Sequence, residues 1–382
     1  MKKLLVALLI TAGFGSAQAQ AQSNVTVYGI LDVGYIGSSS DANSSGKAIT
    51  TTSNSFGNGA ESTSRIGLKG AEDLGGGTSA IFTVETGLTP SQGQVSTWIN
   101  RQSFVGLKQN GLGQVTIGTQ YTPVHIAVGG TDPGQQNQMT GNVIYSTGAA
   151  STTSGSGTDT AYTVRTANTI VAKSDKFAGF SGTAMYTMSN TDATQTSTTG
   201  GNTNYSGWGL SADYTWNKLY ATVAYQSLKS DNTFTTSTPT YWTMSTTTGG
   251  GVNSVDNQTY AGLTYDFGVV KAYAQYVSRE VTSTLDSSNY LKRTAQQIGV
   301  RGNFTSTIEG WASVGNGKYN AFGTSSPTVD FTGFQLGTNY WLSKRTNLYA
   351  IYGQTKSESA NVAGQAPALS ASNYAVGMRH TF

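Results

Sequence analysis

The sequence predicts an all-β protein: a closed, antiparallel, transmembrane β-barrel of sixteen strands. Three observations predict this fold. Short segments alternate apolar with polar residues, tight turns occupy every second connection, and long polar segments occupy the others. A period of two places apolar side chains on one face of a sheet and polar ones on the other. Beyond the N-terminal segment no run reaches the roughly 18 apolar residues that a spanning helix needs, so strands must cross the membrane.

The chain begins with a predicted secretory signal peptide, residues 1–21. Two lysines precede the apolar run Leu4–Phe14, and the small residues typical of a cleavage site follow. Cleavage after Ala21 leaves residues 22–382 as one barrel domain, because no linker or charge block divides them. A membrane anchor is the alternative, but the apolar run is too short to span a bilayer.

The composition excludes several classes of protein. Charged residues make up 11% of the chain and the formal charge is +3, which falls to +1 (20 basic against 19 acidic residues) once Lys2 and Lys3 are removed. Such a balance lacks the basic field of nucleic-acid binders, so we expect no nucleic-acid partner. There are no cysteines, which excludes disulfides and thiolate metal sites and suits a chain that crosses an oxidising compartment.

The first predicted hairpin, residues 64–88, carries the pattern most clearly. Ile66 and Leu68 alternate with charged residues, the turn Asp73–Gly77 follows, and Phe82 and Val84 alternate with polar residues. In a soluble sandwich the apolar face would form the core. In a membrane barrel it faces lipid, and the charged side chains point into the lumen.

Tight turns recur along the chain and set the number of strands. They lie at Asp73–Gly77, Asn110–Gly113, Lys176–Gly179, Trp216–Lys218, Asp266–Gly268, Asn303–Ser306 and Leu342–Lys344. About ten residues of alternating pattern flank each turn on both sides, the length of a tilted transmembrane strand. Seven turns join fourteen strands, and the opening strand Val25–Ile36 and the closing strand Asn373–Phe382 make sixteen.

Much longer segments separate these hairpins. They are rich in Ser, Thr, Asn and Gly, show no helical period, and are predicted to be loops: 37–60, 89–99, 122–164, 191–205, 230–255, 281–292, 318–328 and 356–371. Short turns at one end and long loops at the other are typical of outer-membrane barrels. A large soluble sandwich or a solenoid does not predict this asymmetry.

Aromatic residues gather beside the short turns and predict a girdle at one membrane edge. They are Phe177, Phe180, Tyr214, Trp216, Phe267, Phe304, Tyr340, Trp341 and Phe382. The pattern also gives clear lipid faces, as in Trp208–Trp216 and Tyr374–Phe382. Around Phe104 and Leu348 the alternation is poor and assigns no face.

Several motifs resemble the general porins of β-proteobacterial outer membranes. They are NVTVYGI (24–30), SRIGLKGAEDLGGGTSAIFTVE (64–85), NRQSFVGL (100–107), QVTIGTQYTP (114–123) and GMRHTF (377–382). The match runs in order along almost the full chain, and the element SR-x-GL-x-G-x-EDLGGG is specific. The resemblance implies an outer-membrane homotrimer with both termini periplasmic and a long third loop folded into the lumen. Segment 122–164 is the longest predicted loop and fits that role.

The resemblance also implies a pore constriction lined by arginines. By motif these correspond to Arg65, Arg101 and Arg165, with Glu85 at an acidic position that could orient or partly neutralise them. It further implies contact with outer-membrane lipid and lipopolysaccharide, and recognition of the C-terminal strand by the barrel-assembly machinery through Phe382. The third loop lacks the Pro-Glu-Phe-Gly-Gly element of some members, so the resemblance does not set the size of the pore.

Other charges are predicted on the inward face of the wall. The alternation points Lys69, Asp32, Asp213, Asp266 and Arg379 into the lumen, together with Lys271, Arg279, Arg293, Arg301 and Glu309. Because guanidinium groups stay charged at physiological pH, and low-dielectric walls focus their field, anions should cross more easily. We therefore predict a passive diffusion channel for small hydrophilic solutes and ions with a weak preference for anions.

Two other classes of function were weighed. An enzyme is disfavoured because the chain has two histidines, His125 and His380, with no partner evident in the sequence, and no catalytic, cofactor or metal motif. A substrate-specific channel or an adhesin remains the alternative. Tyr121, Tyr145 and Tyr162 lie in or beside the third loop, but their spacing forms no aromatic ladder.

Overall fold

The structure is a computed structural model that describes residues 24–44, 47–95, 101–145, 161–194, 196, 201–232, 253–288, 290–321, 326–361 and 368–382. The predicted signal peptide and parts of the predicted loops lie outside these residues. The strands are β1 (Asn24–Ser44), β2 (Lys47–Asn58), β3 (Arg65–Gly75), β4 (Thr78–Thr89), β5 (Gln94–Val95), β6 (Ser103–Gln109), β7 (Gly113–Tyr121), β8 (Arg165–Ser174), β9 (Phe180–Thr191), β10 (Thr203–Trp216), β11 (Leu219–Asn232), β12 (Ser254–Asp266), β13 (Val270–Ser283), β14 (Tyr290–Asn303), β15 (Ile308–Ala321), β16 (Thr328–Trp341), β17 (Thr346–Ser357) and β18 (Leu369–Thr381). The helices are the 3-10 helix η1 (Pro90–Gln92) and the α-helix α2 (Pro123–Thr131).

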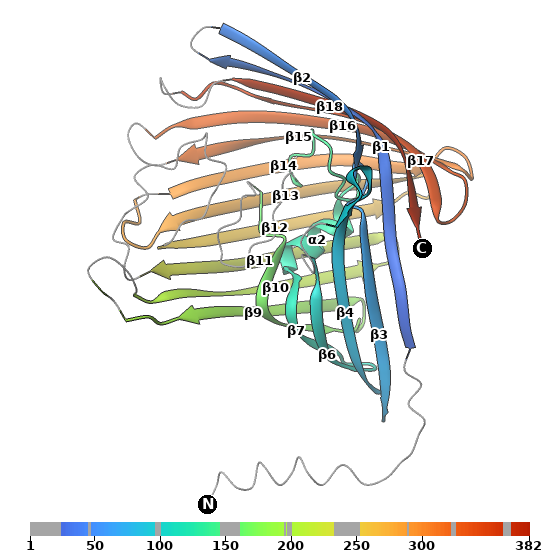
Figure 1. The fold of residues 1–382 in the computed structure, drawn as a ribbon, viewed down its shortest axis with the longest axis vertical. Coiled ribbons are helices and arrows are strands. Elements are labelled where there is room, and N and C mark those ends of the chain that lie inside the picture. Colours follow the sequence, from blue (N-terminus) through green and yellow to red (C-terminus); the bar gives the residue numbers. More distant parts are fainter. Residues whose placement is uncertain are drawn as a thin grey trace, which may run out of the picture.

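These strands form one closed antiparallel barrel of sixteen strands, as predicted (Figure 1). Strand β18 pairs with β1 from Ile30↔Thr381 to Ala42↔Leu369 and closes the sheet. The segments β2 and β3 share one position in the barrel, because both pair with β1. The two-residue strand β5 is an appendage that pairs with the end of β4. No helix in the described part of the chain is long and apolar enough to cross a membrane.

All seven predicted tight turns are present between consecutive antiparallel strands. The first is made by glycines: Gly75, Gly76 and Gly77 all have positive φ, a conformation that glycine adopts without steric cost. Another begins with Asp266, whose carboxylate accepts the N–H of Gly268 at 2.7 Å. Turn chemistry is therefore local, and the sequence predicts it well.

The predicted loops are too long in several places. Residues 37–44 and 47–58 belong to β1 and β2, which pair from Val33↔Asn58 to Ser44↔Lys47. Here the backbone ladder continues although Ser, Thr and Asn replace the apolar residues, because a sheet beyond the bilayer needs no lipid face. Strands also extend into the predicted loops at 203–205, 230–232, 254–255, 281–283, 290–292, 318–321, 356–357 and 369–371. The α-helix α2 in the predicted third loop was not expected either.

The outward face of the barrel is apolar, as the alternation predicts. Ile66 and Leu68 are exposed on it, as are the last residues of β18, including Val376 and Met378. Most of the predicted aromatic girdle is also exposed. Trp341 is an exception: it pairs with Asn347, a buried residue of the inward face, so its prediction as a girdle residue is wrong.

Candidate pore-lining site

The described residues of the third loop, 122–145 and 161–164, lie inside the barrel and cover one side of the inner wall. The Thr122 side chain caps α2 by accepting the N–H of His125 at 3.3 Å, and Pro123 takes the first helical position, where no N–H is needed. The helix packs on β10, β11 and β12 within the barrel (Figure 1). Val124 and Val128 are fully buried there. The described part of the loop therefore packs closely on this wall.

A row of buried glutamines on the covered wall holds the loop in place. Four strands each contribute one glutamine, and each side-chain oxygen accepts a hydrogen bond from the loop. The bonds are Val124 N–H to Gln226 (3.3 Å), Thr163 N–H to Gln258 (2.7 Å), Val143 N–H to Gln297 (3.1 Å) and Asn137 Nδ2–H to Gln335 (3.0 Å). Sequence reasoning missed this row, although its signal is glutamine at the inward register of β11, β12, β14 and β16.

Arginines of the same wall also bind the loop backbone. Arg293 donates to the carbonyl oxygen of Val143 at 2.5 Å, and Arg301 donates to that of Pro133 at 2.8 Å. Arg301 also forms a two-bond ion pair with Glu309, with both N–O distances 2.6 Å. These predicted lumen charges therefore support the loop.

On the other side of the interior, the three arginines predicted from the motifs line one polar cavity. Arg65 begins β3, Arg101 lies just before β6, and Arg165 begins β8. Tyr121 and Tyr145 line the same cavity. Inward-facing positions of neighbouring strands, together with the start of the third loop, thus bring together residues that are far apart in the sequence.

Arg101 is the arginine of this cavity that pairs with a carboxylate, that of Glu85. Its Nε–H bonds Glu85, and its Nη2–H donates to the hydroxyl of Tyr121 at 2.7 Å. Tyr28 donates its hydroxyl to the second Glu85 oxygen at 3.1 Å. The negative charge of Glu85 is therefore held closest to Arg101.

Arg65 and Arg165 have neutral partners instead. Arg65 donates from Nε to the carbonyl oxygen of Thr63 and from Nη2 to the hydroxyl of Ser62, both at 2.9 Å. Arg165 lies over the ring of Tyr121, 5.4 Å from its centroid, and its buried Nε has no hydrogen-bond partner within the described part of the chain. Among the described residues no ion pair neutralises either guanidinium.

His125, for which the sequence showed no partner, is packed beside this cavity. Its ring packs against that of Tyr121 at an interplanar angle of 40°, with centroids 4.4 Å apart, and the side chain of Gln136 lies 3.2 Å from its Nδ1. Burial lowers the pKa of His125 well below 6.5, and the nearby guanidiniums, Arg165 foremost, lower it further. The imidazole is therefore neutral at physiological pH.

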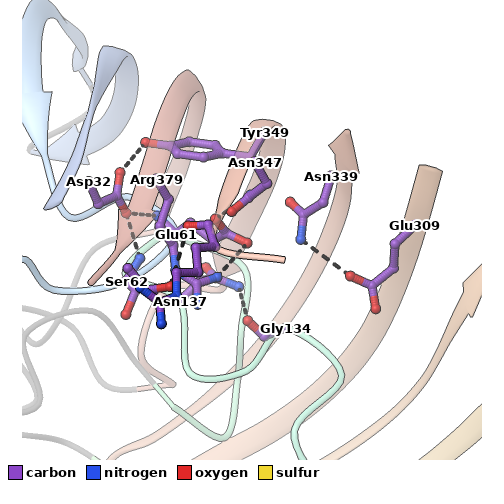
Figure 2. Close-up of polar contacts among 12 residues, drawn as sticks. Asp32, Glu61, Ser62, Gly134, Asn137, Glu309, Asn339, Asn347, Tyr349 and Arg379 are labelled. Carbon is purple, nitrogen blue, oxygen red and sulfur yellow. Dashed lines mark hydrogen bonds and ion pairs between the residues drawn. The ribbon is translucent and has the colours of Figure 1, made fainter. Parts of the chain in front are cut away.

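The other predicted lumen charges lie outside the arginine cavity. Lys69 lies over the ring of Tyr28, 5.3 Å from its centroid, and Asp213 accepts the hydroxyl of Tyr220 at 2.9 Å. Asp266 is exposed and caps its turn. Asp32 and Arg379 belong to a buried polar network around residues 61–62 (Figure 2).

Comparisons with known proteins identify the family of the chain. A family model described as Gram-negative porin matches residues 5–360. An outer membrane porin protein of Bordetella pertussis is 30% identical over the full length of both chains. Outer membrane porin protein 32 of Delftia acidovorans is 39% identical over 32% of this chain and 33% of its own.

The solved structures give the same fold. An anion-selective porin from Comamonas acidovorans has a TM-score of 0.69 and 21% sequence identity, and the match covers 94% of this chain and 100% of that chain. The family and the fold are those of passive channels, and the relatives are outer-membrane proteins. The closed barrel is therefore an outer-membrane channel, and the chain belongs to the Gram-negative porin family.

Proposed function

We propose that this porin is a passive diffusion channel for small hydrophilic solutes and ions, with a weak anion preference set by Arg65, Arg101 and Arg165. The observation that carries the proposal is the shared polar cavity of these three arginines. Three guanidiniums against the one carboxylate of Glu85 give a local charge of 3 − 1 = +2. The electrostatic free energy of an anion is therefore lowered in the cavity, and that of a cation is raised.

The environment of the cavity strengthens this effect. Guanidinium groups keep their charge at any physiological pH, and apolar barrel walls focus the field along the aqueous path. At physiological salt the Debye length is about 8 Å, so ions in solution screen the field of an exposed charge beyond that distance. They screen the field of a partly buried guanidinium less. The anion-selective porin from Comamonas acidovorans shares the fold and supports the same direction of selectivity.

The packing of the aromatic residues favours a general channel over a specific one. The ring of Tyr121 contacts both the Arg165 guanidinium and the imidazole of His125. Tyr162 is fully buried in the loop core, and Tyr145, which also lines the cavity, is buried apart from a small exposed part. A sugar-specific channel needs exposed aromatic faces along its path, and these rings are already packed.

The test is the zero-current potential of the purified protein in a planar bilayer under a potassium chloride gradient. We expect the wild type to prefer chloride, and Arg65→Ala, Arg101→Ala and Arg165→Ala each to reduce that preference. A cation-preferring wild type, or a preference unmoved by all three substitutions, would refute the assignment. Conductance that saturates with one sugar would favour a substrate-specific channel instead.

We further propose, from the family, that the chain works as a homotrimer embedded in outer-membrane lipid and lipopolysaccharide. The barrel-assembly machinery would recognise the C-terminal strand through Phe382. In support, Phe382 exposes its ring on the outward face, and its backbone pairs with Gly29 through two hydrogen bonds of 3.1 Å. Chemical cross-linking in native membranes should give a trimer band, and Phe382→Ala should lower the amount of inserted barrel.

A further inference from the structure

Residues 59–64 form a short detour in the barrel wall. Strand β2 pairs with β1 as far as Val33, and β3 pairs with β1 only from Ile30 onward, so the six residues between them leave the ladder. Gly59 begins the detour with φ of +78°, a conformation that favours glycine, and donates its N–H to the Asp32 carbonyl oxygen at 3.0 Å. We call residues 59–64 the wall detour.

Asp32 lies opposite this gap and anchors the wall detour. Its side chain is fully buried, and its carboxylate accepts three hydrogen bonds (Figure 2). The donors are the N–H of Glu61 (2.9 Å), the N–H of Ser62 (2.6 Å) and the hydroxyl of Tyr349 (2.6 Å). Because ionised acceptors bind backbone N–H groups strongly, this carboxylate fixes the path of the detour.

The wall detour in turn holds Arg65 and contacts the third loop. Ser62 and Thr63 supply both acceptors of the Arg65 guanidinium, each at 2.9 Å. The carbonyl oxygen of Ala60 accepts the N–H of Gln138 in the loop at 3.0 Å. A continuous set of hydrogen bonds therefore runs from Asp32 through the detour to Arg65 and to the loop.

Side chains of β17 and β18 form a second set of contacts with the wall detour. Glu61 lies 3.4 Å from the guanidinium of Arg379 and accepts a hydrogen bond from Asn347 at 2.9 Å (Figure 2). The wall detour is therefore held in two ways. Asp32 binds its backbone N–H groups, and Arg379 and Asn347 bind the side chain of Glu61.

We propose that Asp32 is a positioning residue for the pore: its carboxylate holds Arg65 in the arginine cavity by fixing the wall detour. This inference rests on the proposed role of Arg65 in anion preference. It assigns Asp32 a role opposite in sign to that of a simple lumen charge. As a lumen charge, Asp32 would weaken anion preference, so its neutralisation would raise that preference. If Asp32 is an anchor, its neutralisation releases Arg65 and lowers the anion preference.

The first experiment uses this difference in sign. Zero-current potentials are measured for the wild type, Arg65→Ala, Asp32→Asn and Ser62→Ala, with Asp213→Asn as the control that removes a lumen carboxylate outside the arginine cavity. We expect Asp32→Asn and Ser62→Ala to lower the anion-to-cation permeability ratio by about twofold, toward the value of Arg65→Ala. Asp213→Asn should not lower it. If Asp32→Asn does not insert, Tyr349→Phe takes its place, because it removes a donor to the Asp32 carboxylate and leaves every bond of Arg65 in place.

The outcomes distinguish a failure of the Asp32 anchor from a failure of the proposed function. If Arg65→Ala lowers the ratio and neither Asp32→Asn nor Ser62→Ala does, the anchor is refuted while the proposed function stands. If Arg65→Ala has no effect, the proposed role of Arg65 is refuted, and a second readout decides on the anchor.

The second readout measures the detour directly. The chain has no cysteine, so Thr63→Cys provides a single thiol for labelling with a water-soluble maleimide. We expect the labelling rate to rise several-fold when Asp32→Asn is added and to stay unchanged when Asp213→Asn is added. An equal rate with and without Asp32→Asn would overturn the inference.

Discussion

The two sides of the barrel interior carry similar side chains and use them differently. On the covered wall, Arg279 pairs with Asp256 at 2.6 Å and Arg301 pairs with Glu309, while the glutamine row binds the loop. On the arginine-lined wall, Arg65 and Arg165 have neutral partners. On the covered wall the arginines bind carboxylates or the loop backbone. On the arginine-lined wall two arginines, Arg65 and Arg165, have no ion-pair partner among the described residues.

This difference teaches that inward register alone does not define a pore residue. All of these arginines point inward by the alternation of their strands. What separates them is the third loop. Its helix α2 packs on β10–β12 and its following residues bind β14 and β16, whereas Arg65, Arg101 and Arg165 line an open cavity beside β3, β6 and β8. We therefore expect a charge to contribute to selectivity only where it lines the open cavity without an ion-pair partner.

The largest effect is expected from breaking a buried ion pair on the covered wall. Arg301→Met leaves Glu309 without its partner and removes the bond to the Pro133 carbonyl, so we expect a loss of about 3 kcal/mol in the free energy of unfolding. Urea unfolding in detergent, followed by tryptophan fluorescence, measures it. The double variant Arg301→Met/Glu309→Leu should recover part of the loss, because it leaves no unpaired charge. No recovery would mean that the bond to the loop carries the effect.

The glutamine row offers a matched pair of neighbouring residues. Gln297 is buried and accepts the N–H of Val143, whereas Gln296 is exposed on the outward face of the same strand. Gln297→Leu leaves a buried N–H unpaired, so we expect a loss of about 2 kcal/mol in unfolding free energy. Gln296→Leu should change it by less than about 0.5 kcal/mol. Equal effects would show that the row does not hold the loop.

The lowered pKa of His125 predicts that the stability of the protein depends on pH. Because its pKa is lowered in the folded protein, the unfolded chain binds a proton below pH 6.5 while the folded state does not, and stability falls as the pH falls. We expect the wild type to lose about 1 kcal/mol more than His125→Gln between roughly pH 7 and pH 5.5. Unfolding curves at several pH values test this, and parallel pH profiles would contradict it.

The smallest effect concerns Glu85, the carboxylate that pairs with Arg101. Glu85→Gln removes the charge that partners Arg101, so we expect the anion-to-cation permeability ratio to rise by about twofold. Glu72→Gln, at an exposed site near the first turn, is the control and should change the ratio little because water and salt screen it. A ratio lowered by Glu85→Gln would show that Glu85 serves mainly to position Arg101.

Much of the barrel could be predicted because its signals are local. Turn residues and the period of two define the hairpins, and all seven turns lie where the sequence indicates. The extensions of β1 and β2 could not be predicted, because Ser, Thr and Asn in a strand beyond the bilayer resemble loop residues. Helix α2 could not be predicted either. It contains Gly129 and Gly130 and is buried by the wall, so tertiary packing rather than propensity stabilises it.

The candidate site was predictable in part. The family motifs identified Arg65, Arg101 and Arg165, and the structure brings them to one cavity. The motifs could not assign Glu85 to Arg101, because that choice depends on the pairing of neighbouring strands. Nor could they separate Asp32 from the open lumen charges, since its burial depends on the path of residues 59–64.

The most direct test of the account removes the same charge from each side of the interior. Zero-current potentials are compared for Arg165→Gln in the arginine cavity and Arg293→Gln on the wall beneath the loop. We predict that Arg165→Gln shifts the potential toward cations and that Arg293→Gln leaves it near the wild-type value. Equal shifts would contradict the account, because selectivity would then follow the total charge of the lumen rather than the arginine cavity.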